Sequence, residues 1–140
     1  MNKLKTIIEY LILFLVGGIT YYMIEILWRG YSHYTMMLLG GICFSLIGLL
    51  NEGYNYDMSL RKQMFISAII ITVLEFIFGI ILNKILGLGI WDYSDMPFNL
   101  MGQICLPFTI LWFFLSLVAI VVDDYIRYFI FGEEEPHYKF

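Results

Sequence analysis

The side chains best suited to chemistry in this chain are ionisable and amide groups that lie within or beside apolar stretches. Glu75 is the clearest case, because it is the one charged residue in the apolar run from Gln63 to Asn83. An acidic side chain near the middle of a membrane-spanning helix costs about 2.5–3.5 kcal/mol on insertion scales. A residue placed at that cost has a partner or a function, so Glu75 is a candidate site for a proton, a cation or a substrate.

Helical periodicity gives Glu75 polar and small neighbours on the same face of its run. At 100° per residue, an arc of about 80° holds Glu75 together with Thr72, Gly79 and Asn83. Two roles for Glu75 remain open. It joins helices as a protonated or hydrogen-bonded group, or it binds the transported or reacting species.

Further polar groups lie near the ends of the apolar runs. Glu25 and Arg29 are four residues apart and share a helical face, with His33 as the next step on that face. An interfacial ion pair of small energetic value is the simple interpretation of Glu25 and Arg29. A second polar segment follows the Glu75 run and holds Asp92, with Asn99 shortly after it.

Several polar groups at membrane depth cost less together than apart. The sequence therefore predicts one shared polar pocket in the outer half of the membrane, with Arg29 as the cation partner of Glu75. The predicted pocket residues are Glu25, Arg29, His33, Glu75, Asn83, Asp92, Asn99 and Gln103.

The composition sets the class of protein that must position these residues. The chain has 140 residues, of which 61% are hydrophobic and 14% are charged. Soluble domains are nearer 45–50% apolar and about 25% charged, so this composition indicates an integral membrane protein. A helix of about 20 residues crosses a bilayer, and four apolar runs predict an all-α bundle of four transmembrane helices. The predicted spans lie near 6–28, 34–51, 63–86 and 100–122.

The basic residues predict the orientation of these spans. Six of them fall on the side of the termini, against Arg29 and Lys84 on the other side, which by the positive-inside rule places both termini inside. The prediction is a multi-pass protein of the cytoplasmic membrane, with a single transmembrane domain over 1–132 and an acidic cytoplasmic tail over 133–140. The second span carries Gly41, Ser45 and Gly48 on one face, which predicts close helix packing within the monomer or across a dimer.

The segment between the third and fourth spans is predicted to be a structured outer loop that folds back over the helix ends. Ser94 or Asp95 is expected to cap the fourth helix, with Pro97 in its first turn. Non-helical backbone at this depth is tolerated where protein or a water-filled cavity covers it, so the loop is expected to close the outer side of the site.

Motifs for other chemistries are absent from the sequence. There is no phosphate-binding loop, so the chain does not hydrolyse ATP by that route, and there is no nucleophile elbow or H-E-x-x-H helix. Cys43, Cys105 and the histidines have no metal-ligand spacing. No metal, cofactor or nucleic-acid partner is expected. A lipid-acting enzyme using His33 with Glu25 or Asp92 as an acid–base pair, and a non-catalytic assembly protein, remain alternatives.

Three strings of residues resemble the bacterial CmpB-like family, which is described as putative ABC-transporter type IV. The strings are Glu25-x-x-Trp28-Arg29-Gly30-x-Ser32-His33, Glu75-Phe76-x-x-Gly79 and Trp91-Asp92-Tyr93-Ser94-x-x-Pro97-x-Asn99-x-x-Gly102-Gln103. The resemblance covers about residues 10–122 and implies the membrane part of an importer in the bacterial inner membrane, energised by a separate ATPase. Four spans are few for a solitary transporter, so a homo-oligomer or a partner membrane or ATPase chain is expected. The predicted function is a membrane-embedded transporter subunit for a small polar solute or ion.

Overall fold

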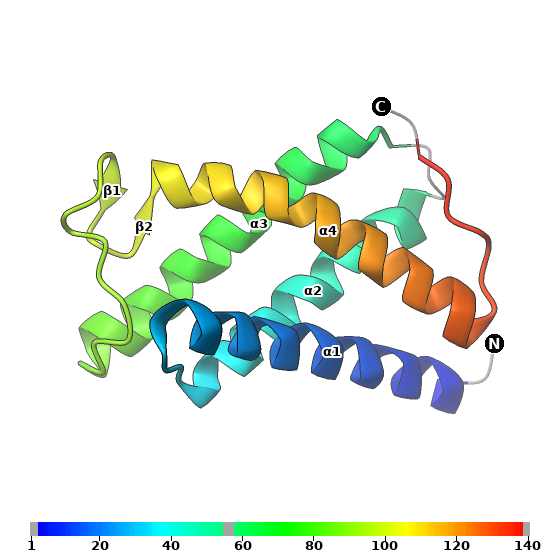
Figure 1. Ribbon diagram of the computed structural model, residues 1–140, viewed down its shortest axis with the longest axis horizontal. Helices are drawn as coiled ribbons and strands as arrows, with labels where there is room; N and C mark the ends of the chain where they lie inside the picture. The colour runs from blue at the N-terminus through cyan, green and yellow to red at the C-terminus, as the bar shows by residue number, and fades with distance from the viewer. Residues whose placement is uncertain (1–2, 55–57, 139–140) are drawn as a thin grey trace.

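The computed structural model describes residues 3–54 and 58–138, with side chains described outside 51–54. Its elements are α1 (Lys3–Arg29), α2 (Tyr34–Tyr54), α3 (Leu60–Gly79), the π-helical turn η1 (Ile80–Ile85), β1 (Asn99–Leu100), β2 (Ile104–Cys105) and α4 (Leu106–Phe131). Successive helices run in opposite directions, so the start of α1 and the end of α4 lie at the same end of the molecule (Figure 1).

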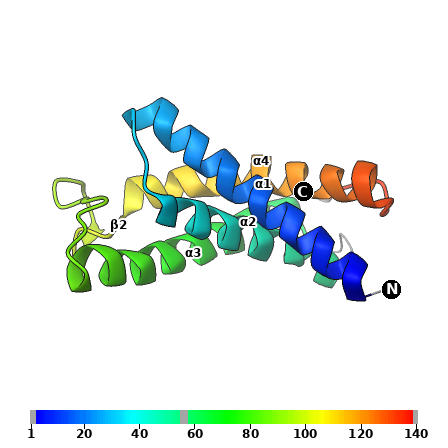
Figure 2. The ribbon, with the colours of Figure 1, turned by 90° about the horizontal axis from the view of Figure 1, so that it is seen from below.

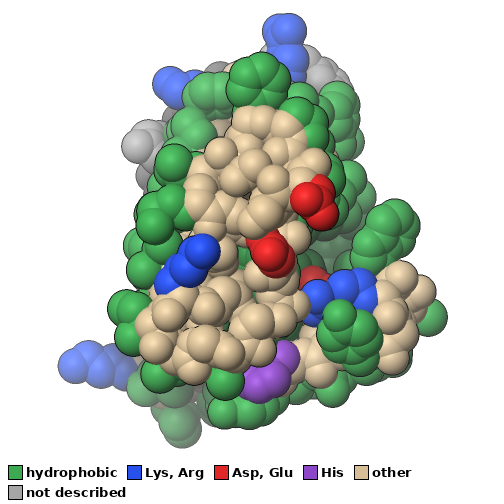
Figure 3. Space-filling model, turned by 90° about the vertical axis from the view of Figure 1, so that its left-hand side faces the viewer, with side chains coloured by type: hydrophobic (Ala, Val, Ile, Leu, Met, Phe, Trp, Pro, Cys, Tyr) green, Lys and Arg blue, Asp and Glu red, His purple; other side chains and the backbone are tan. Residues whose placement is uncertain are grey.

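Among the described residues, three helices are long and apolar enough to cross a membrane: Lys3–Arg29, Leu60–Ile85 and Leu106–Phe131. The second helix has a shorter apolar part, Tyr34–Leu50. The prediction of an all-helical chain with membrane-length apolar helices is thus confirmed, and a fourth crossing by α2 stays a prediction. Figure 3 views the end opposite the termini, where charged side chains lie near the centre and hydrophobic side chains line the flanks.

The connection before α4 differs from its prediction. A small antiparallel hairpin pairs Asn99 with Cys105 and Leu100 with Ile104, and α4 begins at Leu106 with a proline in its first turn and no side-chain cap. The predicted cap at Ser94 or Asp95, with Pro97 in the first turn, is wrong, and the proline of the first turn is Pro107. Asp92 instead accepts a hydrogen bond from the Ser94 backbone N–H at 2.9 Å, so the residues that resemble a cap build a turn.

The end of α4 also lies beyond the predicted limit of 122. The helix continues to Phe131 and buries three charged side chains in its last turns, Asp123, Asp124 and Arg127. Charged residues such as these are typical of the end of a span, but here they have partners inside the protein. The helix therefore continues through them, because paired charges are tolerated in a buried position.

Close packing of α1 on α2 depends on facing glycines. A Cβ atom added to Gly18 would meet the Met37 backbone carbonyl, and one added to Gly41 would lie 2.8 Å from the Phe14 carbonyl oxygen. Small residues allow this approach between apolar helices. α3 packs along α4, while α1 and α4 make much less contact with each other, as the oblique path of α1 in Figure 2 illustrates.

Replacing Gly18 with leucine is expected to separate α1 from α2. The new side chain would collide with backbone, which cannot rotate away, and overpacking costs about 1–3 kcal/mol. The thermal midpoint in detergent should fall, whereas Ile19→Leu on the outward face should leave it nearly unchanged. An unaltered midpoint for Gly18→Leu would show that this helix contact is not close in solution.

Candidate functional site

Glu75 lies on α3 and faces the interior, with 5% of the residue exposed. Two donors hold its carboxylate. The Tyr93 hydroxyl donates to Oε2 at 2.9 Å, and the Trp112 indole N–H of α4 donates to Oε1 at 3.3 Å. Tyr93 belongs to the segment between η1 and α4, which we call the outer loop after its predicted side of the membrane. An ionised carboxylate has about four acceptor positions, so Glu75 keeps capacity for a further donor or a cation.

Glu75 also forms part of the wall of a cavity of about 160 Å³ to which all four long helices contribute. Most of the wall is aliphatic or aromatic. The side chains in it that carry oxygen or sulfur are Thr20, Tyr21, Cys43, Glu75 and Ser116. A cavity of about 150 Å³ is large enough to hold benzene, so this one accommodates a group of that size.

The outer loop is fastened over this region through Gln103 and Asn83. The Asn83 amide donates to Gln103 Oε1 at 2.8 Å, and Asn83 Oδ1 accepts the Ile90 backbone N–H at 2.6 Å. The Trp91 indole donates to the Gln103 backbone carbonyl at 2.9 Å. Gly79 makes room for this arrangement, because a Cβ atom there would lie 2.6 Å from Gln103 Oε1.

Tyr93 is the part of the loop that reaches the buried carboxylate. Its ring stacks on Phe108 with centroids 4.9 Å apart, and its backbone N–H donates to the Gly102 carbonyl at 2.7 Å. Burial, followed by the charge of Glu75, raises the pKa of the Tyr93 hydroxyl above its ordinary value. Tyr93 therefore stays protonated and acts as a donor to Glu75.

Asp92 and Asn99 belong to the exposed part of the loop. Asp92 accepts from the backbone and hydroxyl of Ser94, and hydrogen bonds from the Ser94 side chain and then its backbone lower the pKa of Asp92. Asn99 donates to the Met96 carbonyl at 2.9 Å and accepts the Gly102 N–H at 3.1 Å. Both side chains shape the loop, and neither contacts Glu75 among the described hydrogen bonds.

Glu25 and Arg29 form an ion pair at 2.6 Å near the end of α1. Arg29 also donates to the Ile90 carbonyl at 2.9 Å, which joins α1 to the outer loop. The described partners of Glu75 are Tyr93 and Trp112, whereas the predicted cation partner Arg29 is paired with Glu25.

His33 lies in the connection after α1. Its Nδ1 lies 2.7 Å from the Thr35 hydroxyl, and its ring stacks on Tyr34. In the described contacts His33 is bonded to Thr35 and not to Glu25 or Asp92, the carboxylates with which an acid–base pair was considered.

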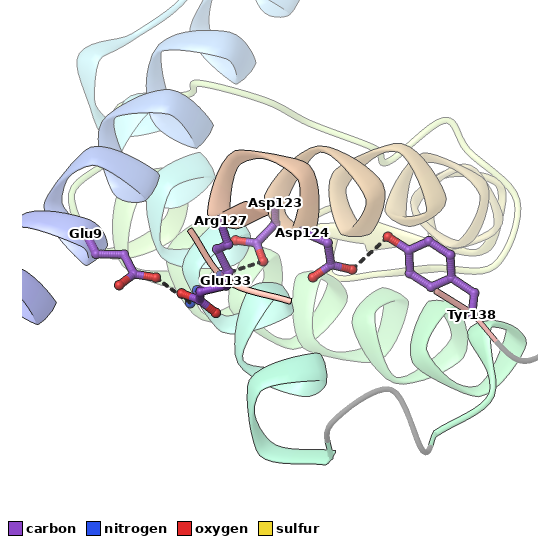
Figure 4. Close-up of polar contacts among 6 residues, drawn as sticks. All are labelled: Glu9, Asp123, Asp124, Arg127, Glu133 and Tyr138. Carbon is purple, nitrogen blue, oxygen red and sulfur yellow. Dashed lines mark hydrogen bonds and ion pairs between the residues drawn. The ribbon is translucent and has the colours of Figure 1, made fainter. Parts of the chain in front are cut away.

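A second polar cluster, which the sequence reasoning missed, lies at the end that carries the chain termini. Figure 4 shows Arg127 between Glu9 of α1 and Asp123 of its own helix, with distances of 3.1 Å and 3.0 Å. Glu133 lies 3.9 Å from the same guanidinium, and Tyr138 donates to Asp124 at 2.8 Å. The four-residue spacing of Asp123 and Arg127 was the available signal. We call Glu9, Asp123, Arg127 and Glu133 the inner clasp, after the side of the membrane predicted for the chain termini.

These features define a helical membrane protein with a buried carboxylate in the wall of an internal cavity. The family model described as putative ABC-transporter type IV matches residues 12–133. The chain belongs to this family, and the resemblance based on the three motifs is confirmed. Comparison with curated proteins and with solved structures finds no match in either.

Replacing Asn83 with alanine is expected to loosen the outer loop. The change leaves the Ile90 N–H and Gln103 Oε1 without their partner, and such a loss costs about 1–3 kcal/mol in a buried site. Hydrogen exchange at Ile90 should accelerate about tenfold or more, and Lys84→Ala, next in sequence and exposed, is the control. Unchanged exchange at Ile90 would contradict the role of Asn83.

Proposed function

We propose that this chain is the membrane-embedded subunit of a transporter and that the cavity beside Glu75 is its solute site. The observation that carries the proposal is Glu75 itself, a buried carboxylate held in place by two donors and forming part of the wall of an internal cavity. Membership of the ABC-transporter type IV family supports the transport class. An ionisable group at membrane depth is commonly part of a solute or ion pathway.

The wall of the cavity favours a particular kind of solute. Most of the surrounding side chains are apolar, so the body of the solute is apolar and small. The carboxylate favours a single cationic or hydrogen-bond-donating group. This refines the expectation of a small polar solute or ion from the sequence, because the polar residues of the outer loop largely bond one another.

The proposed setting is the cytoplasmic membrane, crossed four times, with both termini inside. The alternation of helix direction supports it, since the start of α1 and the end of α4 lie at the same end. The excess of basic residues at that end supports the orientation. In this proposal residues 1–132 form the transmembrane domain and 133–140 the cytoplasmic tail.

The energy source for transport is proposed to come from a partner. The sequence has no phosphate-binding loop, and the family description refers to an ATP-driven class. A separate ATPase chain, a partner membrane chain or a second copy of this chain would complete the transporter. Exposed apolar side chains on every long helix are available to lipid or to such a partner.

Binding of benzyltrimethylammonium, a small aromatic body with a fixed positive charge, tests the proposal. The protein in nanodiscs should bind this probe, and Glu75→Gln should weaken binding about tenfold or more because a charge-assisted contact is lost. Calorimetric titration measures the effect. Uptake of the same probe into liposomes, with any chain that co-purifies, tests transport.

Asp95→Asn is the matched control for this experiment, since it removes one negative charge from an exposed loop position. It should bind the probe like the unaltered protein. Equal binding by the unaltered protein and by Glu75→Gln would remove Glu75 from the solute site. Absence of binding, together with lipid turnover that depends on His33, would favour an enzyme instead.

A further inference from the structure

The cavity has one open side, between α1 and α4. Its lining includes residues that also lie on the outer surface of the bundle: Ile24 on α1, and Val118 and Val122 on α4. These three side chains are 43%, 56% and 40% exposed. These three are aliphatic, the hydroxyl residue Thr20 of α1 is also exposed in the lining, and both helices have membrane-spanning length. This mouth therefore faces the region that the bilayer would occupy.

The outer loop covers the end of the cavity that lies away from the chain termini. Tyr93 lies over Glu75, and Trp91 is buried against α2 and η1 beside it. Two hydrogen bonds hold this covering in place. The Arg29 guanidinium donates to the Ile90 carbonyl, and the Trp91 indole N–H donates to the Gln103 backbone carbonyl. A solute arriving from water on that side would have to displace a packed and hydrogen-bonded segment.

Apolar packing closes the opposite end. Leu13 lies one helical turn before the cavity residue Gly17 and is 0% exposed, and Ile120 is 2% exposed beside the cavity residue Ala119. Beyond them, Asp123 presses against α2, where a Cβ atom on Gly48 would lie 2.6 Å from its Oδ2. These contacts separate the cavity from the end that carries the termini.

The inner clasp fastens α1 to α4 just beyond this packing. Arg127 contacts Glu9 of α1 and Asp123 of α4, and its guanidinium lies 5.2 Å from the ring centroid of Tyr10. Glu9 and Asp123 are 3% and 0% exposed. Two buried carboxylates would repel each other without the guanidinium between them, so Arg127 holds the two helices together at this end.

We propose that the cavity takes an amphiphile dissolved in the bilayer, which enters between α1 and α4, while the inner clasp keeps the cavity closed toward the termini. The occupant has an apolar body that tolerates the aliphatic mouth and a cationic or donor head that reaches Glu75. This inference rests on the proposed role of the cavity as a solute site. Its tests use a native thiol, Cys43 in the cavity wall, and do not depend on transport or on Glu75.

The first test compares two thiol reagents on the protein in liposomes. N-phenylmaleimide, which dissolves in the bilayer, should label Cys43, and the anionic, membrane-impermeant reagent sulfonatoethyl methanethiosulfonate should not label it from either side. Val118→Trp should slow labelling by N-phenylmaleimide because the indole fills the mouth. Ile110→Trp, at an equally exposed position on α4 outside the cavity lining, should have no effect.

Two results of this test would overturn lateral access. One is labelling of Cys43 in the unaltered protein by the charged reagent at a rate similar to that of N-phenylmaleimide. The other is equal labelling by N-phenylmaleimide in the Val118→Trp and Ile110→Trp proteins. Weaker probe binding in Glu75→Gln, together with equal labelling in the Val118→Trp and Ile110→Trp proteins, would mean that the access route alone has failed. Equal probe binding in Glu75→Gln and the unaltered protein, together with slower labelling in Val118→Trp, would mean that the solute site alone has failed.

The second test opens the clasp. Glu9→Gln removes the carboxylate that α1 contributes, while Arg127 keeps Asp123 as a partner. Labelling of Cys43 by the charged reagent from the side of the termini should rise about tenfold or more, as for the loss of one charge-assisted hydrogen bond. Glu135→Gln, an exposed acid of the tail, is the matched control and should label like the unaltered protein.

Cys105 reports whether the fold survives, because it is buried at the outer end. A rise at Cys43 with Cys105 unchanged supports the clasp as a closure. If both cysteines react faster in Glu9→Gln, that variant has unfolded. The same labelling is then measured in Glu133→Gln, which removes a weaker contact with Arg127. Labelling of Cys43 at the unaltered rate in the folded variants would overturn the clasp as a closure.

Discussion

A carboxylate among apolar helices must find hydrogen-bond donors, and the arrangement of the half of the bundle away from the chain termini follows from that requirement. Glu75 obtains one donor from Trp112 on the neighbouring helix and one from Tyr93 on the loop. The second donor fixes the loop over the bundle. Gln103 then fits into the space left by Gly79, and the hairpin of β1 and β2 brings the chain back to begin α4.

The same requirement operates at the other end with charges of both signs. Glu9 and Asp123 are buried and share Arg127, which links the first helix to the last over 118 positions of sequence. Breaking a buried pair by removing one partner costs about 3–5 kcal/mol, while the intact pair contributes little net stability. The clasp is therefore better understood as a device that specifies which helices meet than as a source of stability.

Much of the helical layout was predictable, because apolar runs of membrane length have few other uses. The limits of the third helix were predicted within a few residues, and Glu75 was singled out by its charge. Partners were harder to predict, since Tyr93 looks like an interfacial aromatic residue and Trp112 like one more apolar residue of a span until the fold brings both to a carboxylate. Arg127 and Asp123 were taken for residues beyond a span, because a sequence shows charge but not the counter-charge of a distant helix.

The cavity arises because some pairs of helices pack closely and others do not. Glycines bring α1 against α2, α3 packs along α4, and α2 also contacts both α3 and α4. Apolar helices gain nothing from meeting each other in place of lipid, so close approach depends on small residues and polar contacts. The described polar contacts between α1 and α4 involve Arg127, at the end near the termini. Farther along, the described contact between these helices is the edge-to-face pair of Tyr21 and Trp112, whose ring centroids lie 6.3 Å apart. The cavity beside this pair reaches inward to Glu75.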